Sequence, residues 1–123
     1  MSDVQIETLL TEQLIERYVK VSLEQFDATQ IDDDETYNEL FDEISAISKV
    51  LRDRGGDAHR ALLPLLDHEN AQVRFNAAHD LLTIEPQRAR AALEWVARWG
   101  PGPQRGSAGM SLRSLDSGQY KPT

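Results

Sequence analysis

The stretch Ala61–Ile84, ALLPLLDHENAQVRFNAAHDLLTI, decides how this sequence folds. Its apolar residues recur every three or four positions in two runs, and this spacing predicts two helices rather than strands. The polar turn Asp67–Asn70 separates the runs, and Asn70 has a side chain of the kind that caps helix starts. Pro64 lacks a backbone donor and is expected to bend the first helix. Helices joined by so short a turn pack as antiparallel neighbours.

The helical spacing continues on the N-terminal side of this stretch. A helix is predicted over residues 11–29, with a weaker lead-in over residues 3–10. The acidic run Asp32–Glu35 stands where carboxylates favour a helix start. A second helix should follow up to two consecutive glycines, with Phe41 and Ile44 on its buried stripe. The chain therefore reaches the central stretch as a series of paired helices.

On the C-terminal side the pattern is shorter and more broken. A helix is predicted over residues 86–99, because Pro suits its first turn and a Gly-Pro-Gly-Pro sequence ends it. Residues 100–118 read as a tail whose apolar side chains allow a short docking helix over residues 107–115. We expect residues 1–10 and 119–123 to be frayed ends, as chain termini commonly are.

One short segment resembles a known repeat. Residues 61–84 are similar to a HEAT repeat, with Leu-Leu-Pro on the first helix and Val-Arg followed by Ala-Ala on the second. The usual Asp six residues before Arg74 is replaced by His68, which puts an ion pair to Arg74 in doubt. The resemblance implies an all-α fold of HEAT or armadillo type, an α-α superhelix of about five to six helices, and residues 1–123 fit a single such domain.

Over its whole length the chain resembles the bacterial family catalogued as domain of unknown function 2019. Three stretches carry the likeness: YNELFDEISAI at Tyr37–Ile47, ALLPLLDHENAQVRFNAA at Ala61–Ala78 and SAGMSLRSLDSG at Ser107–Gly118. The resemblance implies a HEAT-like helical fold in the bacterial cytosol. It implies no activity, cofactor or partner.

Composition and charge exclude several classes of function. The net charge is −8, and residues 1–49 hold 13 acidic against three basic side chains, while residues 50–123 hold eight against ten. Such an acidic half repels phosphate backbones, so nucleic acid is not an expected partner. The absence of Cys excludes disulfides and thiolate ligands. Without an apolar run of membrane-spanning length, the protein is expected to be cytoplasmic.

The acidic residues from Glu24 to Glu43, with no basic residue among them, form the first candidate binding surface. Helical spacing places four polar side chains opposite the buried Ile44, and these are Glu35, Asn38, Glu39 and Asp42. Such a face could receive a basic protein partner and speed its association. The alternative is an ordinary solvated helix face whose acids stabilise the helix start.

Two further groups of residues could contact a partner. One lies on the second helix of the central stretch: Phe75, Asn76, His79 and Leu82. The other consists of Trp95 and Trp99, which fall outside the buried stripe of their helix. Neighbouring helices would explain the first group equally well. The tail bearing Met110, or a second copy of the chain, would explain the two tryptophans.

No pattern indicates catalysis. The three histidines fall on different segments at spacings that suit no metal motif, and no nucleophile elbow or phosphate-binding loop occurs. We therefore expect no catalytic residue, metal or cofactor. The sequence favours a non-enzymatic protein-interaction module with an acidic helical face. The alternatives are a structural homodimer, or an accessory subunit of an enzyme or of a toxin–immunity pair.

Overall fold

The computed structural model describes residues 3–122, and within this range every regular element is helical. The expected all-α class is thus confirmed. The described chain holds seven α-helices and one 3-10 helix, more than the five to six expected. The difference arises because the N-terminal lead-in is a separate helix and because the predicted helix before the central turn is broken in two. The helices form two compact units, with unit 1 ending at Leu62 and unit 2 beginning at Leu63.

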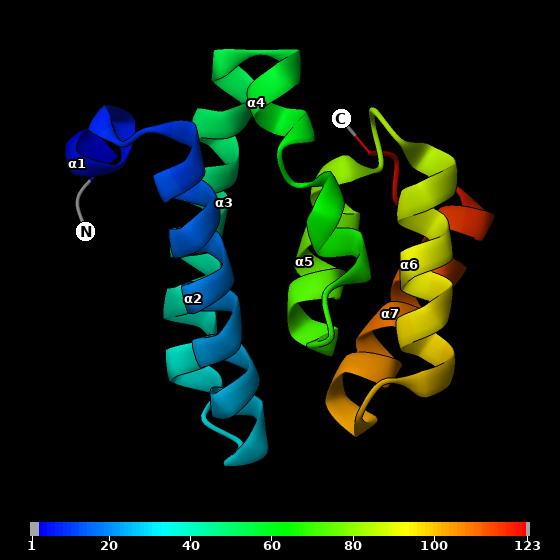
Figure 1. Ribbon diagram of the computed structural model, residues 1–123. Helices are drawn as coiled ribbons and strands as arrows, with labels where there is room; N and C mark the ends of the chain where they lie inside the picture. Colours follow the sequence, from blue (N-terminus) through cyan, green and yellow to red (C-terminus); the bar gives the residue numbers. More distant parts are fainter. Residues whose placement is uncertain (1–2, 123) are drawn as a thin grey trace. The chain divides into compact units, whose positions relative to one another are not determined.

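Unit 1 is built around two long helices that lie side by side (Figure 1). Its elements are α1 (Asp3–Thr8), α2 (Thr11–Gln30), α3 (Asp34–Arg54) and α4 (Gly56–Arg60). Apolar side chains at helical spacing line the buried faces of α2 and α3, namely Leu14, Tyr18, Val21, Ala28, Ile44, Ile47 and Leu51. The long apolar stripes predicted from the sequence therefore form the core of this unit.

The turn between α2 and α3 uses the acidic run as expected. Asp33 is the residue before α3, and its side chain accepts a hydrogen bond from the Thr36 backbone N–H at 3.1 Å. Hydrogen bonding by Thr36, first from its side chain and then from its backbone N–H, lowers the pKa of Asp33, because it favours the charged carboxylate. Asp32 adopts a positive φ of 54°, which lets the chain reverse direction. The run thus caps a helix as well as adding charge.

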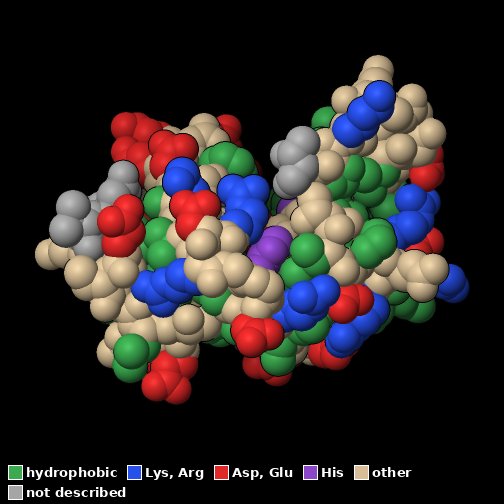
Figure 2. Space-filling view, turned by 90° about the horizontal axis from the view of Figure 1, so that it is seen from above, with side chains coloured by type: hydrophobic (Ala, Val, Ile, Leu, Met, Phe, Trp, Pro, Cys, Tyr) green, Lys and Arg blue, Asp and Glu red, His purple; other side chains and the backbone are tan. Residues whose placement is uncertain are grey.

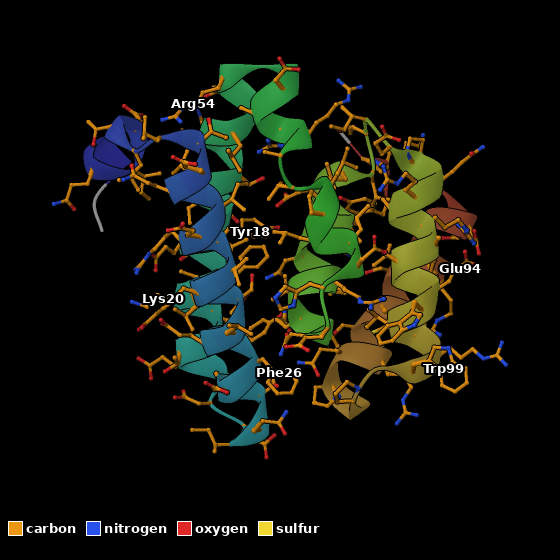
Figure 3. The ribbon with its side chains drawn as sticks, viewed as in Figure 1. Tyr18, Lys20, Phe26, Arg54, Glu94 and Trp99 are labelled. Carbon is orange, nitrogen blue, oxygen red and sulfur yellow. The ribbon has the colours of Figure 1, made fainter. Side chains whose placement is uncertain are left out.

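Arg54 connects the end of α3 to the start of the chain (Figure 3). Its guanidinium donates hydrogen bonds to the carbonyls of Glu7 and Leu9 and, at 3.3 Å, to the Thr11 hydroxyl. These acceptors include the end of α1 and the α1–α2 connection. Together with the burial of Ile6, these bonds anchor α1, which with six residues is too short to be stable alone.

Unit 2 contains shorter elements. They are the 3-10 helix η1 (Leu63–Asp67) and the helices α5 (Ala71–Leu81), α6 (Pro86–Trp99) and α7 (Gly102–Ser117). The core is formed mainly by leucine, valine and alanine side chains, including Leu65, Leu66, Val73, Ala77, Leu81, Ala89, Leu93, Val96 and Ala108. Many of these are small, and α5, α6 and η1 pack together. Small side chains let helix backbones approach closely.

Buried polar contacts also join elements of unit 2. The Gln104 amide of α7 donates to the Gln72 side-chain oxygen at 3.1 Å, and the Gln72 amide donates to Asn76 at 3.0 Å. All three side chains are buried. Because buried amides must be paired, this row fixes the register between α7 and α5.

Three sequence predictions on element bounds need correction. The helix expected before the Asp67–Asn70 turn is divided into α4 and η1, because Pro64 cannot donate a backbone hydrogen bond within it. The next helix ends at Leu81 rather than Ile84. The tail helix begins at Gly102 rather than Ser107, because a proline in its first turn needs no N–H partner.

The sequence analysis expected residues 1–10 and 119–123 to be frayed, with a weak helical lead-in over residues 3–10. The structure describes only part of these ends. Residues 3–8 of the predicted lead-in are helical as α1. At the other end, α7 stops at Ser117 and Gly118 takes the left-handed conformation with a φ of 78°, as a glycine after a helix commonly does. Residues 1, 2 and 123, which the expected frayed ends include, lie outside the described residues.

Candidate functional site

The four polar residues predicted on the acidic face are all exposed. Glu35, Asn38, Glu39 and Asp42 lie on α3 and project from the side opposite its buried residues. Among the described residues, none of these three carboxylates has an ion-pair partner, whereas the neighbouring Glu43 is paired with Arg17 of α2. The face therefore carries negative charge that unit 1 does not neutralise.

Phe41 of α3 is exposed, contrary to the sequence prediction. It was expected on the buried stripe with Ile44, yet its side chain is 54% exposed while that of Ile44 is 6% exposed. The two residues are three apart, which separates them by about 60° on a helix and puts Phe41 at the edge of the stripe. An aromatic ring thus stands in solvent beside the carboxylates of α3.

The charge is not uniform over the molecule. Seen from above, the direction in which α4 lies in Figure 1, the surface has Lys and Arg side chains interspersed with Asp and Glu (Figure 2). Residues up to Leu62 hold 15 acidic and six basic side chains, whereas those from Leu63 hold six and seven. The excess of acid therefore belongs to unit 1.

The second predicted group lies on α5 and at the residue after it, Leu82, and is largely covered. Asn76 and Leu82 are buried, and Phe75 and His79 are partly buried. His79 Nε2 lies 2.8 Å from the Ser111 hydroxyl of α7, and its ring packs 4.7 Å from the ring of Phe75. Packing by a neighbouring helix, one of the two alternatives from the sequence, accounts for this side of α5.

The His79–Ser111 pair is a contact that sequence reasoning missed, because the two residues lie on different helices. Burial lowers the pKa of His79 below its ordinary value of 6.5, and nearby Asp80 opposes the shift. The neutral imidazole is therefore favoured. The ring of Tyr120 contacts it edge-on at 5.7 Å. The pair holds the end of the chain and α7 against α5.

The two tryptophans of α6 are exposed to different extents. Trp95 is 37% exposed and Trp99 is 63% exposed, and Met110 of the tail is 64% exposed. Arg74 of α5 covers Trp95, with its guanidinium carbon 3.8 Å from the ring centroid. An arginine from α5 thus covers part of Trp95. Covering of the tryptophans by the tail with Met110, Leu112 and Leu115, or by a second copy of the chain, stays a prediction.

Arg74 also makes a contact at the turn between η1 and α5. Its guanidinium donates to the backbone carbonyl of His68, while the Asn70 side chain accepts from the N–H groups of Gln72 and Val73 at 2.9 and 3.2 Å. Position 68 holds a histidine where a HEAT repeat usually has an aspartate. Arg74 bonds the backbone carbonyl of this residue instead of an aspartate side chain. It is thus bonded at the turn and lies over the indole of Trp95.

A hollow of about 290 Å³ opens beside this stacked pair. It is lined by Leu66, Asp67, Arg74, Arg88, Ala91, Ala92 and Trp95. Ligand pockets generally exceed roughly 300 Å³, so the hollow is small for a cofactor. It suits a single anchoring side chain.

A second cavity lies between α1 and α3 of unit 1. It measures about 380 Å³ and has Ile6, Ala46 and Val50 among its lining residues. Lys49 and Asp53 at its edge form an ion pair of 2.8 Å with each other. Glu7 and Arg54 also line the cavity, and the Arg54 guanidinium donates to the Glu7 and Leu9 backbone carbonyls.

Neither a cluster of metal-ligand side chains nor a membrane-spanning helix occurs within residues 3–122. No three His, Asp or Glu side chains in that range gather closely enough to hold a metal ion. No described helix combines the length and the apolar character needed to cross a membrane.

These features define an all-α protein with helices paired within each unit and exposed charged and aromatic surfaces on α3 and α6. The chain belongs to the family described as domain of unknown function (DUF2019), whose model matches residues 12–116. A crystal structure of the protein RPA1889 from Rhodopseudomonas palustris CGA009 is similar, with a TM-score of 0.89 and 37% sequence identity over 96% of this chain and 98% of that chain. No curated protein matches the chain.

Proposed function

We propose that this protein is a non-enzymatic interaction module of the bacterial cytosol, and that the exposed face of α3 receives a basic protein partner. One observation carries the proposal: the unpaired carboxylates of Glu35, Glu39 and Asp42 stand on the same helix as the exposed ring of Phe41. Interfaces commonly combine a central aromatic anchor with a polar rim. The acidic rim would steer a basic surface toward the anchor.

The helical architecture suits this role. We infer a HEAT-like packing of the segment from η1 to α5, supported by the Asn70 cap and by the bond from Arg74 to the His68 carbonyl. Paired helices of this kind offer broad, rigid faces for protein contacts. The uncompensated acid of unit 1 disfavours phosphate backbones, so the partner is a protein and not a nucleic acid.

Site-specific photo-crosslinking in native cells tests the proposal. A photoreactive amino acid at Asn38, on the acidic face, should capture a partner through a Lys- or Arg-rich surface, identified by mass spectrometry of the crosslinked peptides. The matched control places the same group at Ser107, an exposed residue of α7. The identity of the captured protein would also tell an enzyme from a toxin as the partner.

The dependence on Phe41 makes the test decisive. Phe41→Ala in the Asn38 background should remove most of the crosslinked product, because the anchor is lost while the carboxylates remain. The proposal is overturned if Asn38 captures no more protein than Ser107. It is equally overturned if the product persists undiminished in the Phe41→Ala variant.

A further inference from the structure

The α6 surface of unit 2 has a charge opposite to that of the α3 face. Arg88, Trp95 and Trp99 recur at spacings of seven and four residues, so they lie along one side of α6. Arg98 adds a guanidinium 5.0 Å from the centroid of the Trp99 ring. Arg90, by contrast, is paired with Asp116 of α7 at 2.9 Å. The side with the tryptophans therefore has arginines without carboxylate partners among the described residues.

The hollow on this side is formed before any partner arrives. Arg74 is held by the His68 carbonyl and stacks on Trp95, so one wall is rigid. Ala91 and Ala92 leave space between Arg88 and Trp95 because their side chains are small. A preformed recess with an aromatic wall and cationic edges suits an aromatic side chain flanked by carboxylates.

The α3 face carries such a group. Phe41 is 54% exposed. Asp34 lies two turns earlier on nearly the same side of α3, and Asp42 follows Phe41 in the sequence and points about 100° away around the helix. Both carboxylates are exposed and form no ion pair within the described chain. The same chain thus carries an anchor with acidic neighbours on unit 1 and a recess with basic neighbours on unit 2.

We propose that the α6 hollow binds Phe41 of a second copy of this chain, with the α3 carboxylates of that copy meeting Arg88 and Arg98. The inference rests on the proposed function, since it names the basic partner of the α3 face. Because two different surfaces meet, the contact is heterologous: copies join head to tail unless two such contacts close a pair.

Two charges work against this contact and predict its character. Asp67 lines the hollow, and each copy has a net charge of −8. Long-range repulsion therefore opposes the local attraction between Asp42 and Arg88. The association is therefore weak. Added salt screens both the repulsion between copies and the attraction at the contact, so exchanging charges at the contact is a sharper test than varying the ionic strength.

Sedimentation velocity of the full chain over a hundredfold concentration range, up to about 1 mM, provides the first measurement. The sedimentation coefficient should rise with concentration. Phe41→Ala should weaken association by about tenfold, since a central aromatic anchor is lost. Ala91→Leu, which fills the hollow and leaves Trp95 in place, should do the same. The matched control is Met110→Ala, an exposed apolar residue of α7 that should leave association unchanged.

Charge exchange identifies the two faces. Asp42→Arg and Arg88→Glu should each reduce self-association, because each places like charges at the contact. An equimolar mixture of the two variants should recover it, since the arginine introduced into one copy then faces the glutamate introduced into the other, and the native pair forms at the other contact. Both positions are exposed, and far-UV circular dichroism confirms that each variant remains helical.

A wild-type chain that stays monomeric throughout overturns the proposal, as does a mixture that fails to recover association. Binding of only a foreign acidic peptide in the hollow also overturns it. If the chain is monomeric while Asn38 still crosslinks a foreign basic protein through Phe41, the second-copy inference fails and the proposed function stands. If neither result is obtained, both fail.

Discussion

Units 1 and 2 reach a helical fold by different means. Unit 1 depends on the long helices α2 and α3, of 20 and 21 residues, whose apolar stripes face each other. Unit 2 has no described helix longer than 16 residues and joins its elements through side-chain hydrogen bonds such as that from Gln104 to Gln72. Periodic sequence therefore suffices to specify a long helix pair, whereas short helices need particular polar contacts to fix their register.

The largest expected effect is loss of core volume, which tests whether packing supports both units equally. Leu51 in α3 and Leu93 in α6 are both fully buried. Leu51→Ala and Leu93→Ala should each lower the free energy of unfolding by about 3 kcal/mol, from lost burial and the remaining cavity. Urea unfolding followed by circular dichroism measures the loss, and Trp fluorescence reports on unit 2, which has both tryptophans. A loss below about 1 kcal/mol in either variant would contradict close packing at that site.

Two arginines bonded to carbonyls allow a smaller, matched comparison. Arg74→Ala should cost about 2 kcal/mol in unfolding free energy, because it removes both a charged hydrogen bond to the His68 carbonyl and the stack on Trp95. Arg54→Ala should cost about 1 kcal/mol, because its bonds to the Glu7 and Leu9 carbonyls are solvent-exposed. Urea unfolding measures both values, and hydrogen exchange should show faster exchange confined to α1 for Arg54→Ala.

The controls are exposed arginines without such bonds. Arg52→Ala in α3 and Arg88→Ala in α6 should change stability by less than about 0.5 kcal/mol. Should Arg54→Ala match Arg74→Ala in cost, the distinction between an exposed and a stacked arginine would be lost. In that case polar contacts would matter equally to unit 1.

The smallest expected effect depends on pH and concerns His79. Its folded-state pKa is lowered from 6.5 by burial, so the unfolded chain binds more protons below that pH. The contribution of His79 to stability is complete above about pH 6.5 and decreases as the pH falls toward the folded pKa. Urea unfolding at pH 7.5 and at successive steps down to pH 5 should show the decrease. His79→Gln should flatten the curve in this range, and an unchanged slope would contradict the assignment.

Much of the fold could be predicted from residue patterns. The spacing of Leu14, Tyr18 and Val21 predicted α2, and the Asn70 cap predicted the start of α5, since both signals are local. The bounds of α7 were missed because Pro103 reads as a terminator in isolation, yet it also fits a first helical turn. The all-α class thus followed from periodicity, whereas single boundaries did not.

The candidate surfaces also differ in how far local sequence pattern could predict them. The exposed face of α3 could be derived from helical geometry and charge, because a solvent-facing position depends mainly on the helix it belongs to. Local pattern could not reveal that Phe41 is exposed, that Arg74 lies on Trp95, or that Ser111 binds His79. The first is a question of how wide the buried stripe is, and the others join residues from different helices.

By itself, then, the sequence determined the helices and the uneven charge, because backbone periodicity and the count of ionised groups depend only on the order of residues. Tertiary structure alone decided which aromatic rings stay in solvent and which arginines remain without a carboxylate. The physical reason is that burial and pairing depend on neighbours far along the chain, whose approach is set by packing.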